Sequence, residues 1–350
     1  MPDLEYTILP VRKRVIKVTL TNNQSTATAN PHIQEIKIDH NYLLSLLGLG
    51  IDPYILPLNT IFYDPQANAQ AYSWYEQFDG TYHKWFVKTQ SISANSTYTL
   101  YMIIDIMQQL VDGNYAGINA IYGQNYLGLS YGQLDNGKNT FLFYDNFQGT
   151  SINTSNWYVG GSDNKTSLTT FTVNNGLTIT SQYSSSTESY GGIVTVNSYP
   201  TGTIFDAYLG SFSVTNSSYN SAHGISAQTG SASSSNGYPY VSWNSKNPNG
   251  GTITYGSISG GLTAITAGPN FPQLNSVLSV FWTATGNEGA CVNYNCVQTN
   301  DESVTNTGSN YYAIGAFANS EGAISTWYYA RLRDYPPNGV MPAVSFSLVD

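Results

Sequence analysis

The sequence predicts an all-β protein made of two tandem antiparallel β-sandwich modules. Three observations lead to this fold class. Short segments rich in Val, Ile, Thr, Tyr and Phe recur along the chain and are separated by clusters of Gly, Asn, Ser and Pro. Helical signals between these segments are sparse, which disfavours alternating β and α units. A turn-rich stretch near the middle of the chain divides the segments into two series.

The strand segments follow one another with regular turn signals, as in antiparallel sandwiches. In TVNNGLTIT, Asn175 and Gly176 stand between two alternating runs, and Asn-Gly is the strongest short signal for a β-hairpin. The other clear strand segments are RVIKVTLTN, IQEIKIDH, TYHKWFVKT, STYTLYMII, GGIVTVNS, FDAYLGSFSV, YPYVSWNS, VLSVFWTAT, YYAIGAFA and YYARLRDY.

Two short helices are expected among the strands. NYLLSLLGLG, residues 41–50, has room for two turns that end at Gly48 or Gly50, because glycine readily adopts the left-handed conformation that closes helices. A second short helix is expected after IMQQLVDG.

The stretch FLFYDNFQGTSINTSNW, residues 141–157, predicts the boundary between the modules. An apolar run stops at Asp145, polar residues follow, and Trp157 resumes the apolar pattern. An active-site loop would need a His or a second carboxylate nearby, and Asp145 stands alone. We expect a first module over residues 1–138 and a second over 139–350. The closing PPNGVMPAVSFSLVD is expected to be an extended segment that packs back on a module or a neighbouring molecule.

The composition indicates a globular protein with an uncharged polar surface. Hydrophobic residues make up 41% of the chain, but charged residues only 9%, against about 25% in soluble proteins generally. A net charge of -9 argues against nucleic-acid binding, which needs a basic stripe. So few charges also imply little self-repulsion in acid. We interpret the basic cluster as charges on a solvated edge strand; its members are Arg12, Lys13, Arg14 and Lys17.

Nothing in the sequence predicts export or membrane insertion. MPDLEYTILPVRKRV lacks the charged n-region and apolar core of a signal peptide, and no run approaches 18 apolar residues. Asn-x-Ser/Thr sequons are nevertheless frequent, and they accept glycans if the chain meets a glycosylation machinery. The candidates are Asn23, Asn95, Asn153, Asn164 and Asn216.

The two cysteines, Cys291 and Cys296, are separated by four residues, a length that suits a hairpin loop with facing flanks. A metal would need two more soft ligands, and no other Cys or His lies nearby in sequence. We expect a disulfide, with two free thiols as the alternative. A disulfide indicates an oxidising compartment or a hyperthermophilic source.

The first half resembles a domain of unknown function that recurs at the start of archaeal and bacterial surface proteins. The matching segments are VTLTNNQSTATANPHIQEIKID, FYDPQANAQAYSWYEQFDGTYHKWFVK, ISANSTYTLYMII and LDNGKNTFLFYDNF. The second half resembles concanavalin-like, laminin-G-like jelly rolls. There the matching segments are YDNFQGTSINTSNWYVGG, VNNGLTITSQ, GGIVTVNSYP and YYARLRDYPPNGVMPAVSF.

This resemblance implies jelly-roll-like sandwiches with an adhesive or structural role, since such pairs occur in secreted and virion proteins of thermoacidophilic archaea. The chain departs from the family's closing strand at one place. Relatives often carry an Asp-Trp pair before an Arg-x-Arg, whereas Tyr328 and Tyr329 precede Ala330 and the Arg331–Arg333 pair here. A polar or calcium contact made by that Asp in relatives is therefore in doubt in this chain.

The carboxylates do not form a glycosidase pattern. Glycosidases place two carboxyl groups roughly 5 to 9.5 Å apart around the scissile bond. Residues two apart share one face of a strand, so Glu-x-Asp-x-Glu would be the expected spacing, and the sequence lacks it. Glu76 and Asp79 are three apart, and Asp301 and Glu302 lie in an expected loop. We interpret these residues as structural.

No nucleophile or phosphate motif is present either. The histidines are outside any Gly-x-Ser-x-Gly frame, and His223, with small flexible flanks, is expected in a surface loop; the four are His32, His40, His83 and His223. The glycines of GGLTAITAGPN and NPNGG lack the Lys-Ser/Thr of a phosphate loop. The sequence therefore predicts no catalytic residue, metal or cofactor.

The candidate ligand-binding residues are aromatic. Trp74 and Trp85 bracket an Asp-Gly turn in SWYEQFDGTYHKWF, and GYPYVSW holds Tyr238, Tyr240 and Trp243. Exposed aromatic rings stack on sugar faces, and nearby Asn, Asp and Ser supply hydrogen bonds. The alternative is that these rings belong to the sandwich core, as half of the aromatic residues on alternating strands must.

These observations favour a structural and attachment protein without enzymatic activity on the surface of an archaeal virion, as a spike, turret, tail or fibre subunit. Assembly inside the host and release by lysis would reconcile an external composition with the lack of an export signal. Its partners would be copies of itself, other virion or surface proteins, and host glycans or pili. One alternative is a secreted or cell-surface glycan-binding adhesin whose leader has been removed. The other is a polysaccharide hydrolase.

Overall fold

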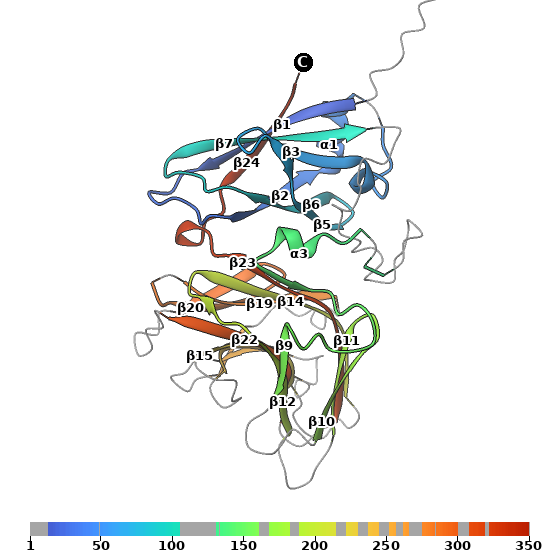
Figure 1. Cartoon of the computed structure of the whole chain (residues 1–350), viewed down its shortest axis with the longest axis vertical. Helices are drawn as coiled ribbons and strands as arrows, with labels where there is room; N and C mark the ends of the chain where they lie inside the picture. Colours follow the sequence, from blue (N-terminus) through green and yellow to red (C-terminus); the bar gives the residue numbers. More distant parts are fainter. Residues whose placement is uncertain are drawn as a thin grey trace, which may run out of the picture. The chain divides into compact units, whose positions relative to one another are not determined.

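A computed structural model describes most of the chain and divides it into two compact units, residues 1–140 with 336–350, and residues 141–335. The fold class is confirmed, since nearly all described elements are antiparallel strands (Figure 1). The described residues are 13–48, 50–105, 131–132, 134–160, 168–182, 189–214, 222–229, 237–244, 252–256, 262–265, 275–283, 285–299, 308–318 and 322–349.

The first unit contains two antiparallel sheets that share one apolar core. Alternating residues of both sheets fill it, for example Val18, Leu100 and Met102 from the larger sheet and Ile36 and Trp85 from the smaller. The larger sheet has the order β24 (Ala343–Leu348), β1 (Lys13–Asn22), β7 (Ser96–Asp105), β3 (Thr60–Asp64) and β4 (Ala69–Ala71). The smaller has the order β2 (His32–Asp39), β6 (Tyr82–Thr89) and β5 (Ser73–Phe78).

Short helices complete this unit. Helix α1 (His40–Leu47) begins where the Asp39 carboxylate accepts a hydrogen bond from the Tyr42 N–H, and it ends at Gly48 with φ 68°. Its end is the one that the sequence predicts. The others are η1 (Leu56–Asn59), α3 (Gly137–Thr140) and η4 (Pro337–Gly339). The second predicted helix, after IMQQLVDG, lies outside the described residues.

The sequence analysis places the closing segment of the chain in the second module, residues 139–350, whereas the structure places residues 336–350 in the first unit. Its strand β24 pairs with β1, with Ile16 opposite Leu348 and Thr21 opposite Ala343. Strand β1 is therefore internal, flanked by β7 and β24, and its interpretation as an edge strand is wrong. Lys13 and Lys17 are exposed because they lie on the solvent face of β1, opposite the buried Ile16 and Val18.

The second unit is a sandwich of two larger antiparallel sheets, drawn as two layers in Figure 1. One, the β10–β21 sheet, has the order β10 (Thr169–Val173), β11 (Leu177–Ser181), β23 (Ala323–Asp334), β14 (Thr203–Val214), β19 (Ser276–Trp282), β20 (Glu288–Val292) and β21 (Asn295–Thr299), and β8 (Phe143–Asp145) pairs with β23. The other, the β18–β9 sheet, has the order β18 (Leu262–Ile265), β17 (Thr252–Gly256), β16 (Gly237–Asn244), β15 (Ala222–Thr229), β22 (Ser309–Ala318), β12 (Ser189–Thr195) and β9 (Trp157–Gly160), and β13 (Tyr199–Pro200) pairs with β22.

Large apolar side chains fill the space between these two sheets. Trp327, Phe205 and Leu278 of the β10–β21 sheet pack in one cluster with Ile225 and Ile314 of the β18–β9 sheet. The predicted Asn-Gly hairpin joins β10 to β11, with Val173 opposite Leu177 and positive φ at both turn residues.

The stretch at residues 141–157 opens the second unit, and Asp145 organises it. The Asp145 carboxylate is buried and accepts hydrogen bonds from the backbone N–H of Phe147 (2.8 Å) and the side chains of Asn156 and Trp157 (both 2.9 Å). The isolated carboxylate of the sequence is therefore the anchor that folds this turn-rich segment onto itself.

Replacing Asp145 by Ala is expected to destabilise the second unit by about 3 kcal/mol, because the indole N–H of Trp157 is left buried without its charged acceptor. Denaturant unfolding followed by tryptophan fluorescence measures the change. Asp79→Ala, which removes an exposed turn carboxylate of the first unit, is the control and should cost about 1 kcal/mol. An equal loss in both variants would contradict the role given to Asp145.

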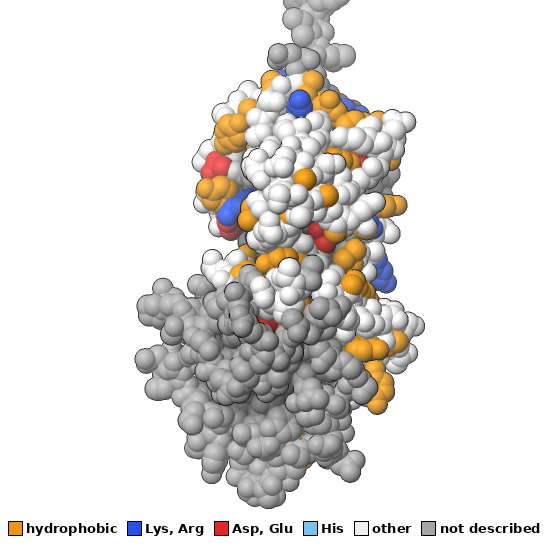
Figure 2. Space-filling view, turned by 90° about the vertical axis from the view of Figure 1, so that its left-hand side faces the viewer, with side chains coloured by type: hydrophobic (Ala, Val, Ile, Leu, Met, Phe, Trp, Pro, Cys, Tyr) orange, Lys and Arg blue, Asp and Glu red, His pale blue; other side chains and the backbone are white. Residues whose placement is uncertain are grey.

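The described surface is as poor in charge as the composition predicts. In Figure 2 uncharged polar side chains and backbone cover most of the described area, and the few Lys, Arg, Asp and Glu side chains are scattered. Among the described residues, no helix has the length and apolarity of a membrane-crossing segment.

Candidate functional site

The outer face of the β18–β9 sheet, opposite the sandwich core, carries a row of small residues. Ile193, Ile225 and Ile314 point into the core, so their sequence neighbours on the same strands point outward. Neighbouring strands align these outward positions in register. The row, which we call the small-residue row, consists of Gly160, Gly192, Gly315, Gly224, Ser242, Thr254 and Ala264.

By backbone register the small-residue row crosses seven adjacent strands; the side chains of Ser242, Thr254 and Ala264 are not among those described. Four consecutive strands contribute glycine; Gly192 is half-buried, and Gly160, Gly224 and Gly315 are buried. A Cβ atom on Gly315 would lie 2.5 Å from the Gly191 carbonyl oxygen, so the site tolerates no side chain there. Glycine within strands marks places where a ligand or another backbone approaches closely.

An exposed aromatic ring lies at one end of this row. Tyr158 is 58% exposed, and its Cε1 atom lies 2.5 Å from the position that a Cβ on Gly160 would occupy. Its ring therefore lies against the last glycine of the row, where no side chain competes for the space. A tyrosine in this position offers both a ring face and a hydroxyl group.

A buried hydroxyl group lies beside the row. Ser226 is on β15, between Ile225 and Ala227, which both face the core, so its side chain faces the opposite way. It is fully buried, and in the described structure its Oγ has no hydrogen-bond partner. Leaving a hydroxyl group in this state costs about 1 to 3 kcal/mol.

The strands of this sheet carry no charge. Their described segments contain no Asp, Glu, Lys or Arg, and His223 is their only titratable residue other than tyrosine. These described strand segments therefore offer aromatic rings, hydroxyl groups and backbone, and no charged side chain.

Trp74 and Trp85 do not form a binding surface, which corrects the prediction for the first unit. Their side chains are 0% and 2% exposed. Trp85 packs in the core, and the Trp74 indole donates to the Asp135 carboxylate. The two rings lie on opposite faces of the small sheet, because side chains alternate along its strands. Both are buried because both faces of this sheet are covered there.

The aromatic candidates of the second unit all lie on strand β16. Tyr240 pairs with Ser226 and Trp243 pairs with His223, so Tyr240 belongs to the row of positions next to the small-residue row. Tyr238 lies on the same strand, and none of the three side chains is among those described.

The structure corrects the prediction of a surface loop for His223. It lies on β15, is fully buried, and bridges the two sheets through Ser181 Oγ (3.0 Å from Nε2) and Ser325 Oγ (2.7 Å from Nδ1). Trp327 Nε1 donates to Ser325 Oγ, so the indole and the imidazole share the Ser325 hydroxyl group. Burial lowers the pKa of His223 to about 3.

His83 is the other buried imidazole with partners on both nitrogens. Tyr75 OH and His40 Nδ1 lie 3.0 Å from its Nδ1 and Nε2. Burial, and then the neighbouring His40, lower the pKa of His83 to about 3. His32 is also buried, beside the Gln34 side chain, and no histidine of the described chain faces a nucleophile on an open surface.

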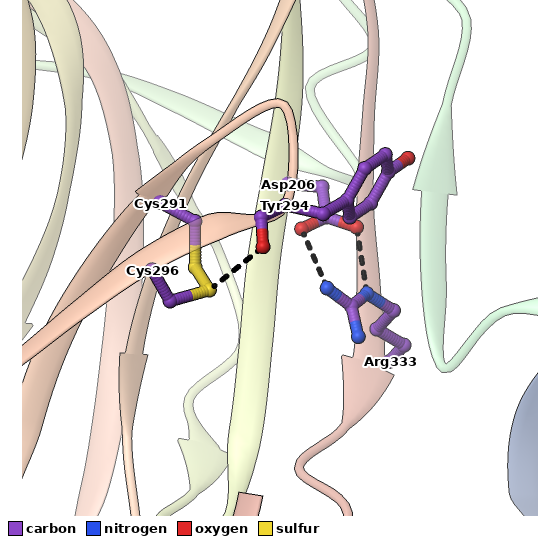
Figure 3. Close-up of a disulfide and its surroundings, with 5 residues drawn as sticks. All are labelled: Asp206, Cys291, Tyr294, Cys296 and Arg333. Carbon is purple, nitrogen blue, oxygen red and sulfur yellow. Dashed lines mark hydrogen bonds and ion pairs between the residues drawn. A yellow bond between two sulfur atoms is a disulfide. The ribbon is translucent and has the colours of Figure 1, made fainter. Parts of the chain in front are cut away.

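The two cysteines form a disulfide that closes the β20–β21 hairpin, as their spacing predicts. The hairpin turn places Tyr294 next to a buried ionic cluster (Figure 3). Arg331 and Arg333 each approach Asp206 Oδ2 to 2.9 Å, and Arg331 donates to the Tyr294 hydroxyl at 2.7 Å. The Arg-x-Arg of the sequence is thus a structural motif inside the second unit.

The remaining predictions concern metals, carboxylates and glycosylation. The described residues contain no group of His, Cys, Asp or Glu suited to a metal. Glu76 is buried 3.5 Å from Lys84, and Asp301 and Glu302 lie outside the described residues. Asn23, Asn95 and Asn153 are exposed, whereas Asn164 and Asn216 fall outside the described chain.

No family model matches the chain. A curated relative, an uncharacterised protein of Sulfolobus islandicus rod-shaped virus 1, is 31% identical over 147 residues, which are 41% of this chain. The chain spans only 23% of that relative's length. This match links part of the chain to a viral protein and assigns it no activity.

Solved structures share the sandwich fold at low identity. An endo-acting O-glycanase of the human gut microbiota is 12% identical with a TM-score of 0.43, over 55% of this chain and 99% of that one. An endo-β-1,3-glucanase from Pyrococcus furiosus is 11% identical with a TM-score of 0.40, over 60% and 95%. A β-agarase A in complex with oligoagarose is 9% identical with a TM-score of 0.38, over 59% and 91%.

These structures are jelly-roll-like sandwich proteins, and they contradict the predicted function. The sequence favours a virion structural protein without enzymatic activity, whereas the proteins that share the fold are enzymes named for glycan substrates. Likeness at this identity is one of fold, so the residues of any site in this chain must come from its own geometry.

Proposed function

We propose that the second unit binds a neutral polysaccharide chain on the outer face of the β18–β9 sheet. The observation that carries this proposal is the small-residue row, which aligns small residues across seven strands and glycine on four consecutive ones. A flexible, flat, hydroxyl-rich chain fits such a strip, because sugar rings need close contact along an extended path.

Two further features support a sugar ligand. The exposed ring of Tyr158 lies at the end of the row, where it can stack on a pyranose face. The Ser226 hydroxyl, buried beside the row, has no hydrogen-bond partner among the described residues. A strip without charged residues also favours neutral over anionic chains, since an anion would lose its hydration without gaining a counter-ion.

Binding is tested by calorimetric titration of the full chain with a soluble β-1,3-glucan and an oligoagarose, with polygalacturonate as the anionic comparison. We expect at least one neutral probe to bind and the anionic probe to bind more weakly. Tyr158→Ala should weaken binding about tenfold. Gly224→Val, which places a branched side chain in the row but suits a strand, should weaken it further.

The matched control is Tyr72→Ala, which removes a comparably exposed tyrosine of the first unit (47% exposed) and should leave the affinity unchanged. Thermal unfolding of each variant verifies that the fold is intact. Equal affinity of the native chain and both site variants would refute the proposal. Assaying the same mixtures for new reducing ends measures hydrolysis, whose carboxylate pair would have to come from outside the described strands of this sheet.

A further inference from the structure

Two of the glycosylation sequons lie on neighbouring loops at one end of the first unit. Asn23 begins the loop that follows β1, and Asn95 lies in the turn before β7. The Asn95 N–H donates to the Gln24 carbonyl (3.0 Å), and the Thr28 N–H donates to the Ile92 carbonyl (3.0 Å). The two loops are therefore joined directly.

Asn22, and not Asn23, holds these loops together. The buried Asn22 side-chain amide donates to the carbonyl oxygens of Thr26 (2.9 Å), Ile92 (3.2 Å) and Ser93 (3.1 Å). The adjacent Asn23 is exposed, and its side chain makes no hydrogen bond with the described residues. The fold therefore explains Asn22 but does not require an amide at position 23.

The Asn95 sequon is equally accessible. Asn95 adopts a left-handed conformation with φ 50°, and its side chain is exposed and makes no hydrogen bond with the described residues. Thr97, the hydroxyl residue of this sequon, is also exposed, as is Ser25 of the Asn23 sequon. The middle residue, Ser96, instead uses its hydroxyl to bond the Ser93 carbonyl.

We propose that Asn23 and Asn95 both carry N-linked glycans, which would cover this end of the first unit. In the modification, the side-chain nitrogen bonds to C1 of a sugar on a lipid-linked oligosaccharide. The bond from C1 to the lipid phosphate breaks, the lipid phosphate leaves, and the amide gives up one proton. Asn153 is not included, because its amide oxygen accepts from the Ser155 N–H and holds the side chain against its own turn.

The test is peptide mass spectrometry of the full chain isolated from the cells or particles that naturally produce it. We expect a hexose-containing mass increment on the peptides with Asn23 and Asn95. Unmodified Asn23 and Asn95 in that material would overturn the proposal. A chain modified at only one of the two would refute the joint site.

Variants locate the modification in a host that exports the chain through an N-glycosylating route. Ser25→Ala and Thr97→Ala remove the sequon hydroxyl groups and keep both asparagines, so each should abolish occupancy at its own site. Ser96→Ala changes the middle position of a sequon and should leave Asn95 occupied. Asn68, which shares the left-handed conformation (φ 49°) but is not in a sequon, should remain unmodified. Occupancy that persists in Thr97→Ala would contradict the assignment.

Discussion

Lowering the pH from 7 to 4 is expected to destabilise the native chain far more than a His223→Gln variant. His223 has a pKa of about 3 in the fold and 6.5 in the unfolded chain. Between these values only the unfolded chain takes up the proton, so stability is full above pH 6.5 and falls as the pH drops toward 3. The contribution of His223 at pH 4 is about 3 kcal/mol.

Protonation is unfavourable because His223 is fully buried and the described groups around it are uncharged. The described groups around His223 are the hydroxyl groups of Ser181 and Ser325 and the ring edge of Phe212. A second ring proton would place a positive charge among these buried, uncharged side chains. Glutamine can both donate and accept, so it keeps two hydrogen bonds and does not titrate.

Denaturant unfolding at pH 7 and pH 4 gives the difference between native and variant chains. His83→Gln is the matched variant in the first unit, where His83 also has a pKa of about 3, and each substitution should remove only the pH dependence of its own unit. NMR titration of the His223 ring in the native chain provides a second measurement and should show a neutral ring down to about pH 3. Protonation of that ring near pH 6 would contradict the account.

Asp206→Asn is expected to destabilise the second unit by about 3 to 5 kcal/mol, since it leaves two buried guanidinium groups without their carboxylate. Asp206 and Arg331 are fully buried and Arg333 nearly so. Burial alone would raise the pKa of Asp206, but the charges of Arg333 and Arg331 hold it below its ordinary value. The carboxylate is therefore ionised in the folded chain, and its removal leaves the positive charges of Arg331 and Arg333 buried without a negative partner.

Removing the whole cluster should cost less than breaking it. In Asp206→Leu with Arg331→Met and Arg333→Met, no buried charge remains, so much of the stability lost in Asp206→Asn should return. Lys13→Met, which removes an exposed cation of the first unit, should change the unfolding free energy by less than about 0.5 kcal/mol. A loss below 1 kcal/mol in Asp206→Asn would show that the cluster is not the stabilising element described here.

Local patterns in the sequence predicted local structure well. The alternating segments became strands, Asn175-Gly176 became a hairpin turn, and the spacing of Cys291 and Cys296 gave a disulfide. Each of these depends on residues that are close in sequence. The second unit begins at Phe141, within the stretch that the sequence singles out.

Features that depend on distant pairing could not be read from the sequence. Strand β24 joins β1 from the far end of the chain, which turns an apparent edge strand into an internal one. The small-residue row requires the order β18-β17-β16-β15-β22-β12-β9 and its register, neither of which follows sequence order. The scarcity of charge predicts weak repulsion in acid, but it does not reveal that His83 and His223 are buried with lowered pKa values.

The most direct test of polysaccharide binding is an NMR titration of the full chain labelled with ¹⁵N-glycine. On addition of the neutral probe that binds in calorimetry, the account predicts shifts of the amide signals of Gly160, Gly192, Gly224 and Gly315. Gly48 and Gly80 of the first unit should not shift. If the chain is saturated with the probe and the amide signals of these four glycines do not shift, the probe binds elsewhere and the account is contradicted.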